Sequence, residues 1–381
     1  MLLKIRRAPL LKALTRCCNI ADKKNHAFSY VALHAIHNVN EMTLQLTSQD
    51  ANHIVTEYVE AEVTESGVLC VPVGILHAFV RKAKVDVNIE KIGNLCQVSA
   101  GNAILKINTV FNNNDIASDL SELQQLQPFA TLKINRAMFE TIAFAMSQDE
   151  NRHTMHGICI HIVTNNDIHE ARTIATDAHR LAIYVTHVTP PDLIWNIKNV
   201  SGETQVILTK KTITEILKLF VEEAEELLLC LCDKYVYILV HQTKFYAKTI
   251  HGTFPKYDGI TQKYYHYHVE CNREELLDAV ECAAIISEDK IRVVNLSLQH
   301  KQHILKISAL HYSAGFAENS VFLLQPSETD WQDSFNVKYI IDAMRHIKSD
   351  NVMIFFDTQS SQIKITDSTT HAAQYIIMPM R

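Results

Sequence analysis

The chain repeats itself, and this repetition constrains its fold more than any other feature of the sequence. The segment Leu3–Ala8 (LKIRRA) returns 129 residues later as Leu132–Ala137 (LKINRA). A shorter third copy, Asn272-Arg273, follows Asn135-Arg136 by 137 residues. A period of this length predicts tandem copies of one structural unit, and three copies fill the 381 residues.

Each copy is expected to open a helix, because apolar residues follow it at three-to-four-residue spacing. Asn135 and Asn272 suit the N-cap position, and Pro9 suits a first helical turn. A second helix is repeated in the same register in each third. Its matched apolar positions are Leu76, Val80 and Ala83, then Ile213, Leu217 and Phe220, then Ile340, Met344 and Ile347.

Short alternating stretches between the helices predict antiparallel strands. Examples are residues 104–107, 236–239, 304–307 and 363–365. Because helices and strands are segregated, the predicted class is α+β, with three tandem repeats of a two-helix, antiparallel-sheet domain. Polar segments at residues 112–128 and 258–263 mark the boundaries. We expect domains at residues 1–128, 129–263 and 264–381.

Composition excludes several classes of protein. The longest apolar runs last about six residues, far short of the roughly 18 that cross a bilayer, so no membrane segment is expected. Nine cysteines form neither a C-x-x-C pair nor an even disulfide framework, which predicts a reducing, cytoplasmic location. The basic start of the chain belongs to the repeat. It is therefore interpreted as part of the folded domain and not as a targeting peptide.

Motifs for catalysis are absent from the sequence. It holds no G-x-G-x-x-G, Walker loop, G-x-S-x-G or H-E-x-x-H, so no cofactor, catalytic residue or metal ligand is assigned. A metal-assisted hydrolase that uses histidine pairs stays as the alternative, although no pair has the further ligands of a zinc site. The pairs are His34 and His37, His153 and His156, His266 and His268, and His300 and His303.

Basic residues recur at matching positions of the second helix in the repeats. Arg81, Lys218 and Arg345 occupy one repeat position, and Lys211 and Lys338 occupy another. An array that presents one face of each unit builds a continuous surface. Because the formal net charge is −6, such a positive face would be a concentrated feature suited to a polyanion.

Four separated motifs carry a resemblance to a known family. They are TDAHRLA at residues 176–182, GTFPKY at 252–257, FNV at 335–337 and YIIMPMR at 375–381. With the threefold repeat, they make the chain resemble the bacterial sliding clamp, the beta subunit of DNA polymerase III, over nearly its full length. The resemblance implies a head-to-tail homodimer that closes into a six-domain ring around duplex DNA. It also implies a processivity factor without catalytic activity.

The family binds DNA without reading its sequence, through cations near phosphates. The resemblance therefore implies partners of two kinds: double-stranded DNA, and proteins that carry a short linear motif. The latter are the DNA polymerase III catalytic subunit, the clamp loader, and other DNA polymerases and repair proteins. The implied DNA-facing residues are Lys23, Lys24, Arg81, Lys82, Arg136, Gln148, Lys211, Lys218, Arg273, Lys338 and Arg345.

The resemblance also implies a hydrophobic peptide groove and a dimer interface. Methionine suits such a groove because its flexible thioether can repack around different partners, although Met378 and Met380 could equally pack inward. The deeper groove residues are Thr176, His179, Arg180, Leu181, Pro255, Ile260, Ile376 and Met378. The shallower ones are Arg152, Met155, Pro379, Met380 and Arg381. The dimer would join Leu105 and Ile107 to Ile285 and Ile286.

Four positions depart from the family pattern. Ala178 stands where the family usually has Gly, and Gly259 stands where an Arg commonly borders the groove. We expect these two changes to alter peptide preference. His153 and Thr154 replace aromatic residues that often flank DNA, so stacking contacts are not predicted there.

Overall fold

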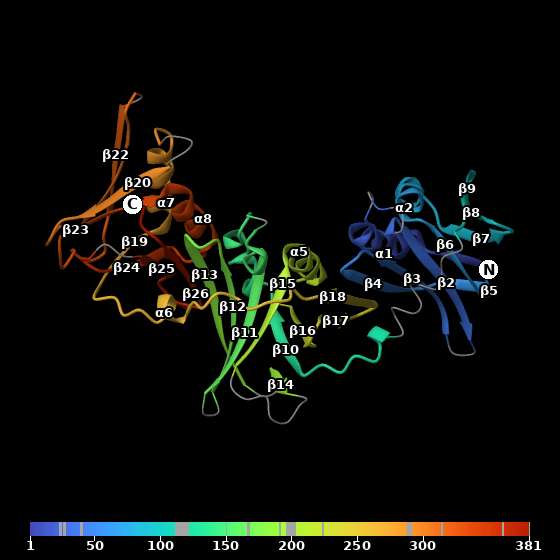
Figure 1. The fold of residues 1–381 in the computed structure, drawn as a ribbon. Helices are drawn as coiled ribbons and strands as arrows, with labels where there is room; N and C mark the ends of the chain where they lie inside the picture. Colours follow the sequence, from blue (N-terminus) through green and yellow to red (C-terminus); the bar gives the residue numbers. More distant parts are fainter. Residues whose placement is uncertain are drawn as a thin grey trace. The chain divides into compact units, whose positions relative to one another are not determined.

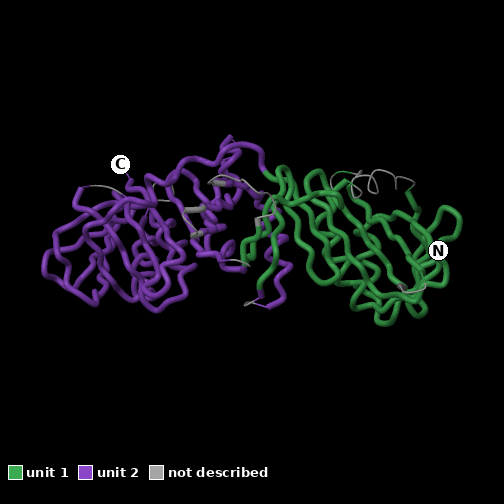
Figure 2. The backbone as a smooth tube through the Cα atoms, turned by 90° about the horizontal axis from the view of Figure 1, so that it is seen from below, with its two compact units in different colours: residues 1–134, 192–198, 226–249 green, residues 135–191, 199–225, 250–381 purple. Residues whose placement is uncertain are grey.

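The computed structural model describes residues 1–22, 25, 28–38, 41–110, 122–149, 151–165, 168–189, 192–195, 203–222, 225–287, 292–313, 315–359 and 362–380. The fold is mixed α+β with antiparallel strand ladders, as the sequence predicts. The chain forms two compact units, residues 1–134, 192–198 and 226–249, and residues 135–191, 199–225 and 250–381 (Figure 2). None of the helices described is long and apolar enough to cross a membrane.

Within the part of the chain that the structure describes, the first unit contains two sheets together with helices α1 (Arg7–Ile20) and α2 (Val73–Lys82), which are labelled in Figure 1. The strand orders are β5-β1-β7-β8-β9 and β14-β10-β16-β17-β18-β4-β3-β2-β6. Helices α1 and α2 pack on each other, and α1 also covers β3 and β4. The strands are β1 (Leu2–Ile5), β2 (Tyr30–Asn38), β3 (Glu41–Gln49), β4 (His53–Glu60), β5 (Glu62–Glu65), β6 (Gly67–Pro72), β7 (Val87–Ile92), β8 (Leu95–Ala100), β9 (Ala103–Asn108), β10 (Ala130–Asn135), β14 (Leu193–Trp195), β16 (Glu226–Leu231), β17 (Tyr235–Val240) and β18 (Thr243–Lys248).

The second unit also contains two sheets, in the orders β15-β11-β12-β13-β26-β25-β24-β19 and β22-β21-β20-β23. Its strands are β11 (Gly157–Asn165), β12 (Ile168–Thr176), β13 (Arg180–Val188), β15 (Glu203–Thr209), β19 (Tyr267–Asn272), β20 (Val293–Leu298), β21 (Ile304–His311), β22 (Gly315–Phe322), β23 (Trp331–Asn336), β24 (Asn351–Phe356), β25 (Ile363–Asp367) and β26 (Ala373–Ile377). Its helices are α4 (Ala137–Glu140), η2 (Ala143–Ala145), η3 (His153–Met155), α5 (Lys210–Leu219), α6 (Asp258–Thr261), α7 (Arg273–Ala284) and α8 (Val337–His346).

Strands from the middle third of the chain complete a sheet in each unit. In the first unit β18 pairs with β4, placing Thr243 opposite Glu57. In the second unit β13 pairs with β26, placing Leu181 opposite Ile376. The compact units therefore do not coincide with the three predicted repeats, and the division at residues 128 and 263 stays a prediction.

The predicted helix starts are confirmed at both asparagines. Asn272 Oδ1 accepts the backbone N–H groups of Glu274 and Glu275, and Asn135 Oδ1 accepts that of Met138. These bonds satisfy donors that a helix N-terminus otherwise leaves open. The helix after Asn135 is shorter than its counterparts, since α4 ends at Glu140 and only the short η2 follows.

Candidate functional site

The loop that joins β12 to β13 is fixed by its own side chains. Thr176 Oγ1 donates to the carbonyl of Arg180 at 2.6 Å and accepts from the N–H of Ala178 at 3.1 Å. Asp177 Oδ1 accepts from the N–H groups of His179 and Arg180, both at 3.0 Å. The loop therefore keeps one shape and presents an exposed His179.

Arg180 lies behind this loop with only 9% of its surface exposed. Its guanidinium pairs with Asp177 at 3.0 Å and Asp342 at 2.6 Å, and donates to the carbonyl of Phe144 at 2.8 Å. It also lies over the rings of Phe144 and Tyr339, at 5.0 and 4.5 Å from their centroids. Because its donors are already engaged, Arg180 positions the loop against α8 and η2.

A hydrophobic cluster lies beside this loop on the eight-stranded sheet. It brings together the predicted Leu181 and Ile376, with Ile260 packed at its edge. Sequence reasoning missed most of its other members, although Phe254 and Tyr257 stand in the same GTFPKY motif as the half-buried Pro255. The remaining members are Cys159, Ile174, Ile183 and Ile207, with Val185 and Ile250 partly buried against them.

The end of the chain runs alongside the loop. The N–H of Met378 donates to the carbonyl of His179 at 2.9 Å, and the N–H of Met380 donates to that of Ser334 at 2.8 Å. Met378, Pro379 and Met380 are half-buried. Their side chains are therefore neither sealed in the core nor fully in solvent, which suits a groove wall that repacks.

Two residues predicted for the shallower part of the groove, Arg152 and Met155, lie at the two ends of the segment around η3. Arg152 donates to the carbonyl of Asp177 at 2.6 Å and pairs with Asp149 at 3.3 Å. Met155, three residues after Arg152, is half-buried. Arg381 lies outside the described residues. On the other side, a Cβ added to Gly259 would meet no atom within 4 Å, so the edge of α6 is open there.

One arginine in each repeat binds the C-terminal end of the second helix. Arg7 donates through Nε to the carbonyl of Val80 at 3.2 Å and through Nη2 to that of Arg81 at 2.8 Å. Arg136 donates to the carbonyl of Phe220 at 3.1 Å. The last carbonyls of a helix lack partners within the helix and carry partial negative charge, so a cation there is stabilising.

The third repeat has the same arrangement. Arg273 donates to the carbonyls of Ser349 at 3.1 Å and Met344 at 3.5 Å, at and beyond the last turn of α8. Arg136 and Arg273, both assigned to DNA by the resemblance, are therefore partly committed to helix ends. Arg7 was not predicted, although it occupies their position in the LKIRRA repeat.

The remaining basic candidates lie mostly at helix ends. Arg81, Lys82, Lys218 and Arg345 occupy last turns and are exposed, and Lys338 is exposed in the first turn of α8. Cations in last turns stabilise the helix dipole, which is a structural reason for the repetition beside the functional one. Gln148 is exposed and Lys211 half-buried, while Lys23 and Lys24 lie outside the described residues.

Two of these cations already have acidic partners. Lys218 pairs with Glu215 at 2.8 Å, and Arg345 pairs with Glu281 at 2.7 Å. The Arg345–Glu281 pair is largely exposed and contributes little to stability, whereas Glu215 is mostly buried beside the exposed Lys218. Each carboxylate offsets the local positive charge. A phosphate would have to compete with these carboxylates.

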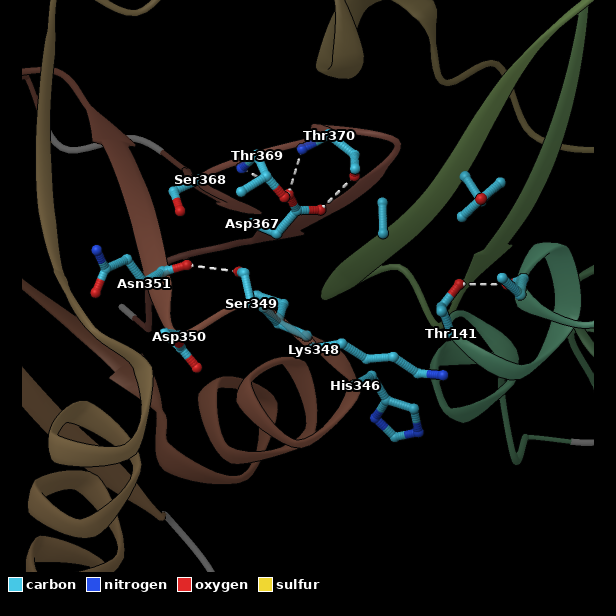
Figure 3. A pocket seen from close by; sticks show the side chains of 14 residues that line it. Thr141, His346, Lys348, Ser349, Asp350, Asn351, Asp367, Ser368, Thr369 and Thr370 are labelled. Carbon is cyan, nitrogen blue, oxygen red and sulfur yellow. Dashed lines mark hydrogen bonds between the residues drawn. The ribbon is translucent and has the colours of Figure 1, made fainter. Parts of the chain in front are cut away.

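A pocket of about 590 Å³ brings two predicted residues of the second unit together. Arg136 and Arg345 line it with Lys348, His346 and Glu140. A neighbouring pocket of about 650 Å³ shares His346 and Lys348 and is bordered by the hydroxyl-rich turn at residues 367–370 (Figure 3). Three cations, Arg136, Arg345 and Lys348, line the first pocket. Of these two pockets it is therefore the better suited to a phosphate.

The predicted dimer residues differ in their exposure. β9 is an edge strand, as expected, with Leu105 half-buried and Ile104, which was not predicted, exposed. Ile107 is only 5% exposed and faces the core of its own unit. Ile285 is 85% exposed directly after α7.

β22 is also an edge strand with exposed apolar side chains, and it was not predicted as part of the interface. Phe322 is 72% exposed, and Phe316 is exposed at the other end of the strand. Leu310 and Tyr312 are exposed on and after the neighbouring β21. An exposed apolar edge strand is a template for pairing with another chain.

The histidine pairs are not assembled into a metal site. Across the described part of the chain, no three His, Cys, Asp or Glu side chains are grouped so that they could hold an ion. His266 instead pairs with Asp357 at 2.9 Å, on the surface. The hydrolase alternative gains no support from the geometry.

Comparison with known proteins gives a consistent picture. Residues 131–256 match the family model described as DNA polymerase III beta subunit, central domain, and residues 262–381 match that of its C-terminal domain. A "Beta sliding clamp" of Rickettsia felis is 27% identical, over 98% of this chain and 97% of that protein. The protein of the same name from Escherichia coli K12 is 27% identical over 90% of each chain.

Solved structures share the fold. The DNA polymerase III subunit beta of Pseudomonas aeruginosa superposes with a TM-score of 0.87 at 24% identity and covers all of both chains. The DNA polymerase sliding clamp of Caulobacter crescentus gives a TM-score of 0.85 at 22% identity, again over all of both chains.

Proposed function

The chain belongs to the DNA polymerase III beta subunit family, and from this premise we propose that it acts as a DNA sliding clamp. In this role it encircles duplex DNA and tethers the replicative polymerase, with no catalytic step of its own. The observation that carries the proposal is the match of the family models to two consecutive thirds of the chain. Relatives named beta sliding clamp align with 98% of its length.

A ring requires two different edges that recognise each other. Two edge strands suited to this are β9 in the first unit and β22 in the second, and both carry exposed apolar side chains. Pairing one edge with the other in a second copy is a head-to-tail interface, which closes when the rotation allows. Two copies of three repeats then give a six-domain ring in the cytoplasm.

DNA binding in such a ring is electrostatic. Exposed cations at the ends of α2, α5 and α8 support this role, with Arg136 and Arg345 meeting at one pocket. Contacts of this kind attract phosphates without reading bases, so the ring can slide. Because no nucleotide-binding motif is present in the sequence, a separate clamp loader would open the ring.

The groove beside the β12–β13 loop would capture the linear motifs of protein partners. The partners proposed are the DNA polymerase III catalytic subunit, the clamp loader, and other polymerases and repair proteins. The cluster around Leu181 and Ile376 supports this assignment because it places apolar side chains, with the partly buried Ile260 at their edge, next to a hydrogen-bonded loop.

Retention on circular DNA tests the proposal. The chain, loaded by its clamp loader onto a nicked plasmid, should co-elute with the DNA in gel filtration and be released when the plasmid is linearised. Arg81→Glu with Lys218→Glu should reduce loading about tenfold or more while the dimer persists, because phosphate contacts are replaced by repulsion.

A matched control carries the same charge change elsewhere. Lys91→Glu with Lys234→Glu alters two exposed lysines, on β7 and in the turn before β17. This variant should load normally. Retention that survives linearisation, or equal loss in both double variants, would contradict encirclement by a basic face.

A further inference from the structure

The row of side chains that includes Leu181 and Ile376 of the hydrophobic cluster continues onto the neighbouring strands. Leu181 on β13 stands opposite Ile376 on β26, and Ile376 stands opposite Lys364 on β25. Lys364 stands in turn opposite Phe355 on β24. Directly opposed residues of neighbouring strands project from the same face of a sheet, so Lys364 lies next to Ile376 of the hydrophobic cluster.

Two aromatic rings hold the ammonium group of Lys364. Its Nζ lies 4.5 Å from the ring centroid of Phe355 and 5.2 Å from that of Tyr265. The side chain is half-buried, and this burial lowers its pKa. Cation–π contacts position an ammonium but do not neutralise its charge.

Among the residues that the structure describes, Lys364 has no acidic partner, unlike the cations around it. Asp357 pairs with Lys263 at 3.1 Å and with His266 at 2.9 Å. Within the described residues, no carboxylate lies within ion-pair distance of Lys364. A partly desolvated cation without a counter-ion favours an anion supplied from outside.

We propose that Lys364 is an anion-binding position at the border of the peptide groove. It would take the side-chain carboxylate of an Asp or Glu next to the apolar anchor of a bound peptide. Continuity of the row with Ile376 and the missing counter-ion both favour this occupant. The inference rests on the proposed function of the groove and adds a preference for acidic peptides.

Peptide selection followed by matched titrations tests the inference. Random nine-residue peptides displayed on phage would be selected for binding to the full-length chain. Each selected peptide would then be synthesised with an amidated C-terminus in two versions, one with Asp and one with Asn at the acidic position. Fluorescence polarisation should show the Asn form binding about tenfold more weakly, as expected for loss of one charge-assisted contact. Amidated ends ensure that a side chain supplies the carboxylate.

Variants assign the effect to Lys364. Lys364→Gln should weaken the Asp peptide about tenfold and leave the Asn peptide unchanged, whereas Lys364→Arg should keep the preference. Lys306→Gln, on the separate four-stranded sheet, is the control and should change neither peptide. Thermal unfolding of each variant separates loss of fold from loss of contact.

Several outcomes would overturn the inference. Selected peptides without enriched acidic residues, or an Asp-to-Asn loss of equal size in wild type and Lys364→Gln, would show that Lys364 only stacks on its aromatic neighbours. In either case the groove itself would still bind peptides. If no peptide bound at all, the groove assignment would fall too, while retention on circular DNA would still test the ring.

Discussion

Ala178 adopts a left-handed backbone conformation, with φ of 75°, at the tip of the β12–β13 loop. A residue with a Cβ is disfavoured there by about 1–2 kcal/mol, whereas glycine is not. Hydrogen bonds from Thr176 and Asp177 hold the loop in this shape despite the strain. The Cβ of Ala178, at a position where the family usually has glycine, therefore raises the energy of this loop conformation.

Ala178→Gly should raise the free energy of unfolding by about 0.5–1 kcal/mol, because relief of strain exceeds the added freedom of the unfolded chain. Urea denaturation at neutral pH measures it. Ala83→Gly is the matched control, since Ala83 has an ordinary φ of −58° and should lose stability. A loss of similar size at both positions would show that Ala178 is not strained.

The sequence grouped several residues whose proximity the structure shows, while their role in a peptide groove stays a prediction. Leu181, Ile260 and Ile376 do meet in one cluster. Arg180 was predicted in the groove, yet its partner Asp342 lies 162 residues away in sequence. No local sequence pattern predicts an ion pair between residues so far apart. The structure was therefore needed to recognise Arg180 as a positioning residue.

At the scale of elements, an arginine from the start of each repeat caps the second helix of that repeat. α8 offers the cleanest comparison, because Arg273 binds carbonyls at its C-terminal end while Lys338 sits in its first turn. A cation is favourable at a helix C-terminus and unfavourable at the N-terminus. Two basic residues on one helix are therefore expected to have opposite effects on stability.

Arg273→Ala should lower the free energy of unfolding by about 1–2 kcal/mol, because charge-assisted hydrogen bonds to helix carbonyls are lost. Lys338→Ala removes the same charge and should leave stability unchanged or slightly higher. Thermal unfolding followed by circular dichroism compares them. Equal melting temperatures for the two variants would contradict a capping role for Arg273.

The repeat pattern predicted elements better than their pairing. The alternating stretches at residues 104–107, 236–239, 304–307 and 363–365 are confirmed as parts of β9, β17, β21 and β25. The joining of β18 to β4, and of β13 to β26, was not foreseen. The paired strands are far apart in sequence. Their alternation of apolar and polar residues is equally compatible with pairing to a strand of the same repeat, so it does not indicate the partner.

At the scale of the whole molecule, the proposed ring depends on residues that a single chain leaves uncovered. Ile107 and Ile285 were predicted together as interface residues, yet their exposures of 5% and 85% differ greatly. Ile107 already packs inside its own unit, whereas burial of Ile285 awaits a partner. The sequence could not separate them, because each is an isoleucine in an ordinary apolar pattern.

Ile285→Asp should therefore convert the proposed dimer to monomers without unfolding the chain. A two-membered ring contains the interface twice, so losing about 2 kcal/mol of apolar burial at each copy, about 4 kcal/mol in all, raises the dimer Kd roughly a thousandfold. Sedimentation at micromolar concentration measures the change. Ile107→Asp should instead lower the melting temperature, and Leu228→Asp, at an exposed leucine on β16, should preserve the dimer. A dimer that tolerates Ile285→Asp but dissociates with Leu228→Asp would place the interface on another surface.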